Sequence, residues 1–77
     1  MHKIMVRFKI VKDNRIIETC LDKRLSFIEN IDLLNNILDE KVNDFYVYDP
    51  NKRIFLDKNI PLYEFAITSF MIFYLFS

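Results

Sequence analysis

The side chains that most often perform catalysis or bind metal ions are scarce in this sequence. His2 is the only histidine and Cys20 is the only cysteine. Because nucleophilic catalysis and metal binding both need several such groups close together, we expect neither a nucleophile–base pair nor a metal site. The sequence contains no glycine, so a glycine-rich phosphate loop is excluded. We therefore expect a protein that is not an enzyme and that needs no cofactor.

The remaining reactive groups have simpler explanations. Glu29, Asp32, Asp39 and Glu40 fall in a predicted helix, where acidic side chains more often form a solvated face than an acid–base pair. Cys20 lies in an alternating segment and is expected to be a small buried or half-buried apolar residue. A lone cysteine forms no intramolecular disulfide, and no signal-peptide pattern opens the chain, so we expect a cytoplasmic protein.

Composition narrows the class of partner. Eleven basic residues balance eleven acidic ones, which leaves no net field to attract nucleic acid or an anionic membrane surface. The most apolar run, residues 70–76, is far shorter than the roughly 20 residues of a membrane helix, so we expect no membrane insertion. The 77 residues suit a single domain, residues 1–77, whose thin core must be filled by aromatic rings.

Alternation of apolar and polar residues predicts the strands that would build this domain. The expected strands span residues 3–11, 16–21, 45–48, 53–56 and 70–76. Turns rich in Asn and Asp separate them, as needed in a chain without glycine, because these residues tolerate positive φ. In the turn at 49–52, we expect Asn51 to take the unusual dihedral angle.

One helix is predicted between the second and third strands. Ser26 and Glu29 have the spacing of a capping box, which indicates a helix from 27 to about 40. Ile28, Ile31 and Leu38 recur at helical spacing and should face the core. The residues expected largely on the opposite face are Asn30, Asp32, Asn35, Asn36 and Asp39. A single helical turn is expected near Leu62, Phe65 and Ile67.

This order, ββαββ, a short turn and a final β, predicts an α+β fold of the β-grasp (ubiquitin-like) type. A helix that follows a hairpin covers one face of a sheet, and a right-handed crossover places the last strand parallel to the first in the centre. We expect a mixed sheet of four to five strands with the helix packed across one face.

Two segments carry a resemblance to known proteins. Ser26-Phe27-Ile28-Glu29-Asn30-Ile31 is similar to the helix-opening segment of ubiquitin, and Leu62-Tyr63-Glu64-Phe65-Ala66-Ile67 resembles the turn before its final strand. Within that superfamily, the chain most resembles the small bacterial YukD/EsaB-type proteins of type VII (ESX) secretion systems. It departs from them in the turn before the last strand, where Ser69-Phe70 stands in place of a common glycine.

The resemblance implies an accessory role in protein binding at the cytoplasmic side of a secretion machine. The partner would be a membrane-embedded or ATPase component of that machine, and no catalytic residue is carried over. Ubiquitin-type modifiers and sulfur carriers end in Gly-Gly, whereas this chain ends in Phe76-Ser77. Conjugation and sulfur transfer are therefore disfavoured.

The predicted binding surface is the sheet face turned away from the helix. Alternation directs one set of side chains toward the helix: Ile4, Val6, Phe8, Ile17, Leu21, Ile54, Phe73 and Leu75. The alternate set, including Met5 and Phe76, forms an apolar outer face of the kind found at interfaces. From it we predict these protein-binding residues: Arg7, Lys9, Tyr46, Tyr48, Ile72 and Tyr74. Two alternatives stay open: the chain's own ends or loops cover this face, or it forms a homodimer.

Overall fold

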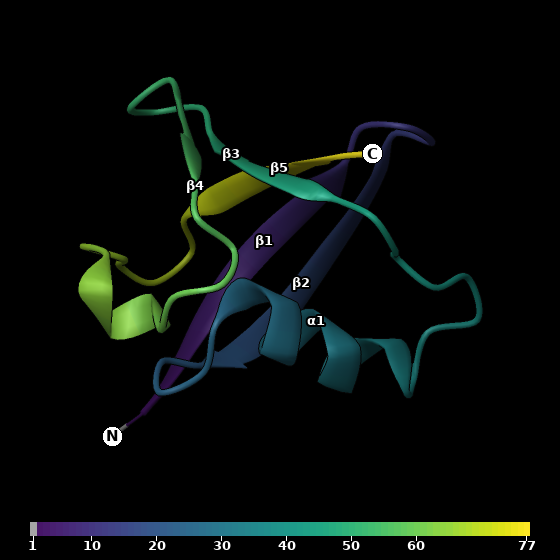
Figure 1. Cartoon of the computed structure of the whole chain (residues 1–77). Coiled ribbons are helices and arrows are strands. Elements are labelled where there is room, and N and C mark those ends of the chain that lie inside the picture. The colour runs from purple at the N-terminus through teal and green to yellow at the C-terminus, as the bar shows by residue number, and fades with distance from the viewer. Residues whose placement is uncertain (1) are drawn as a thin grey trace.

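The computed structural model describes residues 2–77, which form a sheet, one helix and one short helical turn (Figure 1). The elements in chain order are β1 (Lys3–Ile10), β2 (Arg15–Asp22), α1 (Phe27–Asn35), β3 (Tyr46–Asp49), β4 (Ile54–Leu56), the 3₁₀ turn η1 (Leu62–Glu64) and β5 (Ile72–Phe76). This is the predicted order of elements. β1, β4 and β5 are shorter than the expected strands, β2 is longer, and β3 is shifted by one residue.

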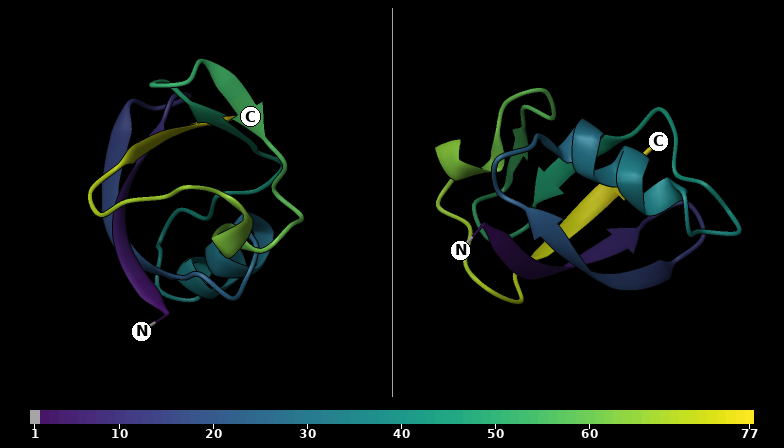
Figure 2. Two further views of the ribbon diagram at one scale, coloured as in Figure 1. Left: turned by 90° about the vertical axis from the view of Figure 1, so that its left-hand side faces the viewer. Right: turned by 90° about the horizontal axis from the view of Figure 1, so that it is seen from below.

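The five strands form one mixed sheet in the order β2-β1-β5-β3-β4. β1 and β5 are parallel in the centre, and the other neighbouring pairs are antiparallel. The helix α1 crosses one face of this curved sheet, and the loop that carries η1 closes one end (Figure 2). The fold is the α+β β-grasp arrangement predicted from the sequence. Within residues 2–77, no helix is long and apolar enough to cross a membrane.

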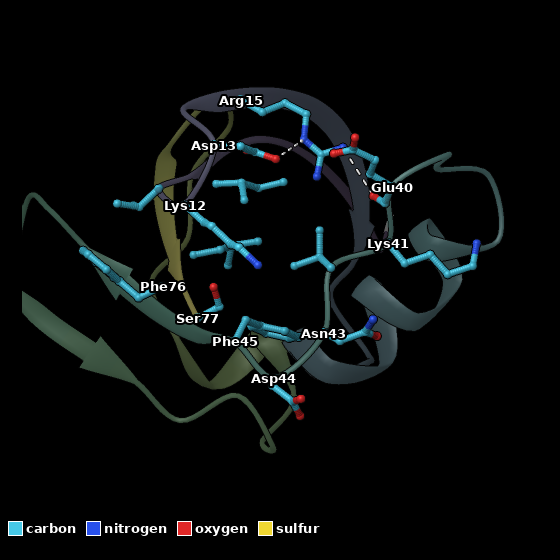
Figure 3. A pocket seen from close by; sticks show the side chains of 14 residues that line it. Lys12, Asp13, Arg15, Glu40, Lys41, Asn43, Asp44, Phe45, Phe76 and Ser77 are labelled. Carbon is cyan, nitrogen blue, oxygen red and sulfur yellow. Dashed lines mark hydrogen bonds and ion pairs between the residues drawn. The ribbon is translucent and has the colours of Figure 1, made fainter.

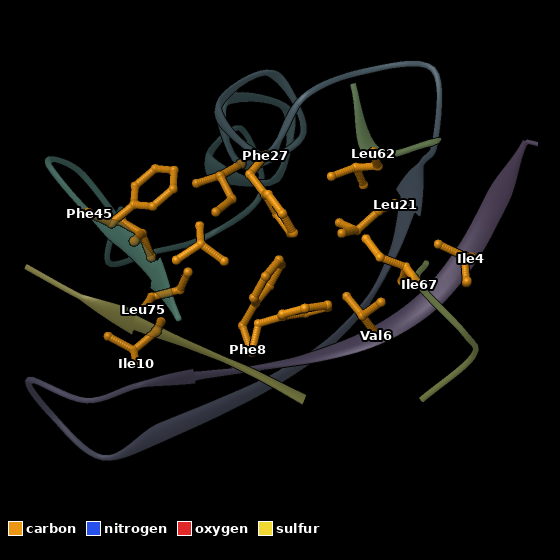
Figure 4. Packing of buried hydrophobic residues seen from close by; sticks show 14 residues of the cluster. Ile4, Val6, Phe8, Ile10, Leu21, Phe27, Phe45, Leu62, Ile67 and Leu75 are labelled. Atoms are coloured by element: carbon orange, nitrogen blue, oxygen red, sulfur yellow. The ribbon is translucent and has the colours of Figure 1, made fainter. Parts of the chain in front are cut away.

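The core lies between α1 and the sheet (Figure 4). Phe27 points from the helix toward Phe8 and Phe73 of the two central strands, with ring centroids 6.2 and 5.3 Å apart. All three rings are fully buried, and Leu62 of η1 fills the end of the core near Leu21. Edge-to-face contacts of this kind stabilise aromatic pairs beyond the burial of their area.

The helix begins as predicted but ends earlier. The Ser26 hydroxyl accepts a hydrogen bond from the Glu29 amide at 3.1 Å, and the Glu29 carboxylate accepts one from the Ser26 amide at 3.0 Å, so the capping box is confirmed. The helix was expected to reach Glu40 but ends at Asn35. The Asn35 side-chain amide bonds both the N–H and the C=O of Val42 at 2.8 Å, which turns the chain back along the core.

The expected placement of two asparagines was also wrong. Asn30 and Asn35 are buried rather than on the solvated face. Asn30 accepts a hydrogen bond from the Asp22 amide and donates to the Asp22 carbonyl, at 2.8 and 2.9 Å. Each asparagine therefore serves as a buried peptide-like group that satisfies backbone atoms of another segment.

Positive φ angles occur at Asn14, Asp44, Arg53 and Phe70. Asn14 and Asp44 fit the expectation for a chain without glycine, whereas Arg53 takes the dihedral predicted for Asn51. Phe70, with φ of 65°, occupies the turn where the resembling proteins carry glycine. These two left-handed residues explain why β4 and β5 begin later than predicted, because a strand cannot continue through them.

Candidate protein-binding surface

The sheet face opposite α1 collects the six predicted binding residues. In the register of the central strands, Arg7 lies beside Ile72 and Lys9 beside Tyr74. Tyr74 is in turn opposite Tyr48 of β3. The alternate residues of these strands are buried against the helix, so the outward orientation predicted for this set is correct.

Four rings on this face form what we call the outer aromatic cluster: Tyr48, Phe55, Tyr74 and Phe76. Tyr48 lies at its centre, with its ring centroid 5.0 Å from Phe55, 5.9 Å from Phe76 and 6.3 Å from Tyr74. Phe55 and Phe76 are also neighbours, at 5.9 Å. Phe55 is 61% exposed while the other three rings are half-buried, so the cluster is a surface layer rather than part of the core.

Cationic side chains border the cluster. The Lys9 ammonium lies 5.6 Å from the centroid of the Tyr74 ring, and the Arg7 guanidinium lies 5.7 Å from that of Phe70. Arg7 also pairs with Glu18 of β2 at 3.1 Å. Aromatic rings flanked by Arg and Lys match the composition of protein interfaces.

Tyr46 lies on the outer face as predicted, opposite Phe76 of β5 and at the margin of the outer aromatic cluster. Its ring is 62% exposed and lies 5.0 Å from the Lys58 ammonium. Lys58 also donates a hydrogen bond to the Phe45 carbonyl at 2.7 Å, which fixes it at this end of β3. Tyr46 is therefore an exposed ring at the margin of the face, beside the outer aromatic cluster.

Sequence reasoning missed the exposed aromatic residues Phe55 and Phe70, and it expected two further residues, Ile54 and Cys20, to be more buried than they are. Phe55 could have been found, because an inward Ile54 implies an outward Phe55. Ile54 is nevertheless 47% exposed, since β4 is the sheet edge and Ile54 is opposite the last residue of β3. Phe70 could also have been found, because the expected strand over 70–76 gives it the parity of Ile72 and Tyr74, although in the structure a left-handed turn places it beside Arg7. Cys20, expected to be at least half-buried, is exposed on the outer face opposite Met5.

A pocket of about 890 Å³ lies at the end of the molecule where β1 turns into β2 (Figure 3). The loop of residues 40–45 and the last residues of the chain complete its wall. In its wall, the Arg15 guanidinium lies 3.5 Å from the Asp13 carboxylate and donates a hydrogen bond to the main-chain carbonyl of Glu40 at 3.3 Å. Among residues 2–77, no three His, Cys, Asp or Glu side chains gather in a possible metal site.

One ion pair lies at the end of β2. Arg24 donates hydrogen bonds to both oxygens of the Asp22 carboxylate, at 3.0 and 2.7 Å. These bonds, with a further one from the Arg24 backbone amide, hold the pKa of the Asp22 carboxyl well below its usual range. The same contact raises the pKa of Arg24. This pair anchors the loop before α1 and lies away from the outer aromatic cluster.

Comparison with known proteins supports the fold. The solution NMR structure of the ubiquitin-like domain of an Arabidopsis thaliana protein is similar to this chain, with a TM-score of 0.74. The two sequences are 21% identical, and the match covers 99% of this chain and 78% of that one. No protein-family model and no curated protein matches the sequence. The likeness therefore shows a ubiquitin-like β-grasp fold, and at this identity it shows the fold alone.

Proposed function

We propose that this protein is a non-catalytic ubiquitin-like adaptor that binds another protein through its open sheet face. The outer aromatic cluster carries the proposal. The buried core lies on the other side of the sheet, so Tyr48, Phe55, Tyr74 and Phe76 form a second, separate cluster on the outside. Exposed apolar groups that are clustered, rather than scattered, are typical of interaction sites.

The geometry of the cluster suits an interface anchor. Tyr and Phe bury large areas with little loss of side-chain entropy, and the contacts among the rings already restrict their rotation. Lys9 and Arg7 lie at the rim, where they would interact with a partner's acidic groups. Tyr48 and Tyr74 are the proposed centre, with Ile72 beside Arg7 at one margin and Tyr46 at the other.

We further propose that the adaptor serves a bacterial type VII secretion system from the cytoplasmic side. This step depends on the resemblance of residues 26–31 and 62–67 to ubiquitin-like proteins and on the small size shared with YukD/EsaB-type proteins. The partner would then be a membrane-embedded or ATPase component of that system.

The test is affinity purification of the tagged protein from its own host, with quantitative mass spectrometry of the proteins recovered. The change Tyr48→Ser with Tyr74→Ser should abolish recovery of the secretion component. Tyr63→Ser is the control, because Tyr63 is also a surface tyrosine, 62% exposed, but belongs to η1 and lies outside the outer aromatic cluster. Circular dichroism should show that both variants fold.

Two results would contradict the proposal. A folded double variant that still recovers the secretion component would exclude the outer aromatic cluster as the binding site. Recovery of the protein alone, with a sedimentation mass twice that of the 9.4 kDa chain, would favour the homodimer instead.

A further inference from the structure

The edge strand β2 has one side without hydrogen-bond partners. In the sheet order it pairs with β1 only, over eight residues without proline or lysine. Natural sheets usually protect such an edge by shortening it, twisting it or placing lysine and proline on it. The opposite edge, β4, is protected by being only three residues long. β2 is neither short nor interrupted by lysine or proline, so its outward backbone groups are open to pairing.

The hydrogen-bond pattern identifies which groups are free. The Lys23 amide donates to the His2 carbonyl, so these two residues are a hydrogen-bonded pair of the antiparallel ladder. Hydrogen-bonded pairs alternate with non-bonded pairs, so the next ones along the strands are Ile4 with Leu21, Val6 with Thr19 and Phe8 with Ile17. On β2, residues 17, 19 and 21 therefore bond β1, whereas Ile16, Glu18 and Cys20 direct their N–H and C=O groups to the open side. Within residues 2–77, these three residues have no other backbone or side-chain partner for those groups.

The chain itself shows what fits this edge. Asp22 belongs to the same outward row, and its N–H and C=O are both occupied by the side-chain amide of Asn30, at 2.8 and 2.9 Å. A primary amide that accepts from one group and donates to the other reproduces the pairing of a neighbouring peptide unit. The edge is thus capped at its buried end and open from Ile16 to Cys20.

We propose that the open part of β2 binds an extended segment of another protein, which adds a sixth strand to the sheet. Backbone pairing to Ile16, Glu18 and Cys20 would supply most of the affinity, as in other strand-addition complexes. The side chains opposite these residues would lie on the outer face, and those between them would lie near Ile17 and Thr19 on the helix side.

Charge selects the class of segment. Glu18 is the only charged residue of the open row and is half-exposed, at 50% of its side-chain area. Arg7, which pairs with Glu18, is also 50% exposed, and an ion pair this open to solvent is weak. The Glu18 carboxylate can therefore interact with a second cation. We assign to the bound segment alternating apolar residues with Lys or Arg opposite Glu18.

The same residue disfavours a second copy of this chain as the occupant. Two β2 strands that pair antiparallel and use all the free groups are centred on residue 18. That register places two Glu18 side chains directly opposite each other, and like charges so placed are destabilising. Shifting the centre by one residue removes this contact but leaves free groups unpaired.

The test uses isotope-labelled protein, NMR and a blocked peptide of sequence Ser-Ile-Val-Lys-Val-Thr-Ser. In the free protein, the amides of Ile16, Glu18 and Cys20 should exchange with solvent fast, and those of Ile17, Thr19 and Leu21 slowly. The peptide should slow exchange of the first set and shift their signals, with a Kd on the order of 0.1 mM. A peptide N-methylated at its Lys should bind at least about tenfold more weakly, because one hydrogen bond cannot form.

Two variants separate the edge from other surfaces. Glu18→Pro removes an N–H that bonds nothing in the chain, so it should leave β1–β2 pairing intact and abolish peptide binding. If that variant does not fold, Glu18→Lys serves instead and should favour a peptide with Glu in place of Lys. Tyr48→Ser with Tyr74→Ser should leave peptide binding unchanged, which separates this inference from the proposed adaptor function.

Three outcomes would overturn the proposal. They are absence of shifts at β2 up to about 1 mM peptide, binding that survives in folded Glu18→Pro, and protection of the β2 amides that rises with protein concentration without peptide. The last would identify a second copy of the chain as the occupant.

Discussion

At the scale of the residue, Phe70 is the position where local structure conflicts most with side-chain type. An aromatic residue with φ of 65° is strained, because the Cβ atom crowds the following carbonyl. The residue is held there by its amide, which donates to the Met5 carbonyl at 2.7 Å, and by the Arg7 guanidinium over its ring. Strain that persists at an exposed aromatic residue is consistent with a binding role.

The strain can be measured with two substitutions that both remove the ring. We expect Phe70→Gly to be more stable than Phe70→Ala by about 1 kcal/mol, because glycine adopts positive φ without the Cβ clash. Urea denaturation of the two variants gives this difference directly. Equal stabilities would mean that the turn relaxes to negative φ when the ring is removed.

A second residue-scale prediction concerns Asp22 and pH. The hydrogen bonds from Arg24 lower the pKa of Asp22 in the folded protein. Between this lowered pKa and the ordinary pKa of Asp in the unfolded chain, the folded state therefore binds fewer protons than the unfolded state. The stabilisation is therefore complete above about pH 4, the usual range of Asp, and is lost as the pH falls below it. Arg24→Met should be less stable than the natural chain at pH 5 to 7, and the difference should shrink from pH 4 downward in urea titrations. A pH-independent difference would mean that Arg24 stabilises the fold by packing.

Residue types predicted some of these features and could not predict others. Absence of glycine correctly indicated that Asn and Asp would occupy left-handed positions, as at Asn14 and Asp44. Arg53 and Phe70 carry no such local signal, because the chain direction needed by the neighbouring strands determines their dihedral angles. Cys20 was expected to be buried or half-buried because of its residue type, and this missed its exposure. Its side chain lies on the outer face of β2, and β2 is an edge strand of the sheet.

At the scale of the element, the buried asparagines determine where β2 and α1 end. Asn30 bonds both backbone groups of Asp22 and also donates to the Ser26 carbonyl at 2.9 Å. We expect Asn30→Ala to lower the free energy of unfolding by about 2–3 kcal/mol, because buried backbone groups lose their partners. Asn36→Ala, at the exposed C-cap of the same helix, should change it by less than about 0.5 kcal/mol. Similar effects of the two changes, measured in urea, would contradict this role of Asn30.

Periodicity predicted the elements well because the sheet has one buried face. A shift of one residue in the pairing of β1 or β5 would turn Phe8 or Phe73 from the core to the outer face, so the alternation in the sequence determines the face of each residue in these strands. The predicted end of α1 was wrong because the apolar spacing continues beyond the helix. Leu38 continues the apolar spacing and does pack on the core, but it does so from a loop that Asn35 turns back. Helical spacing alone does not distinguish these two cases.

At the scale of the whole molecule, the sheet separates two apolar layers. Phe8, Phe27 and Phe73 form the core on the helix side, and the outer aromatic cluster lies on the other. The sequence predicted the apolar outer face and the position of Tyr48 and Tyr74 within it. It did not predict that Phe55 would complete the cluster or that the Tyr46 ring would lie against Lys58, because those contacts depend on the twist of β3 and β4 and on the position of Lys58.

Adjacent residues of β5 provide the test of whether the two layers are energetically independent. Phe73 is fully buried, so Phe73→Ala should lower the free energy of unfolding by about 3–5 kcal/mol, enough to unfold much of a small domain. Tyr74 is half-buried in the outer aromatic cluster, so Tyr74→Ser should cost only about 1 kcal/mol, the value of its ring contacts. Urea denaturation followed by circular dichroism gives both values, and a protein with Phe73→Ala that is already unfolded without urea fits the expectation. A large loss from Tyr74→Ser would instead show that the outer cluster is needed for folding, and its exposed rings would then require no partner to explain them.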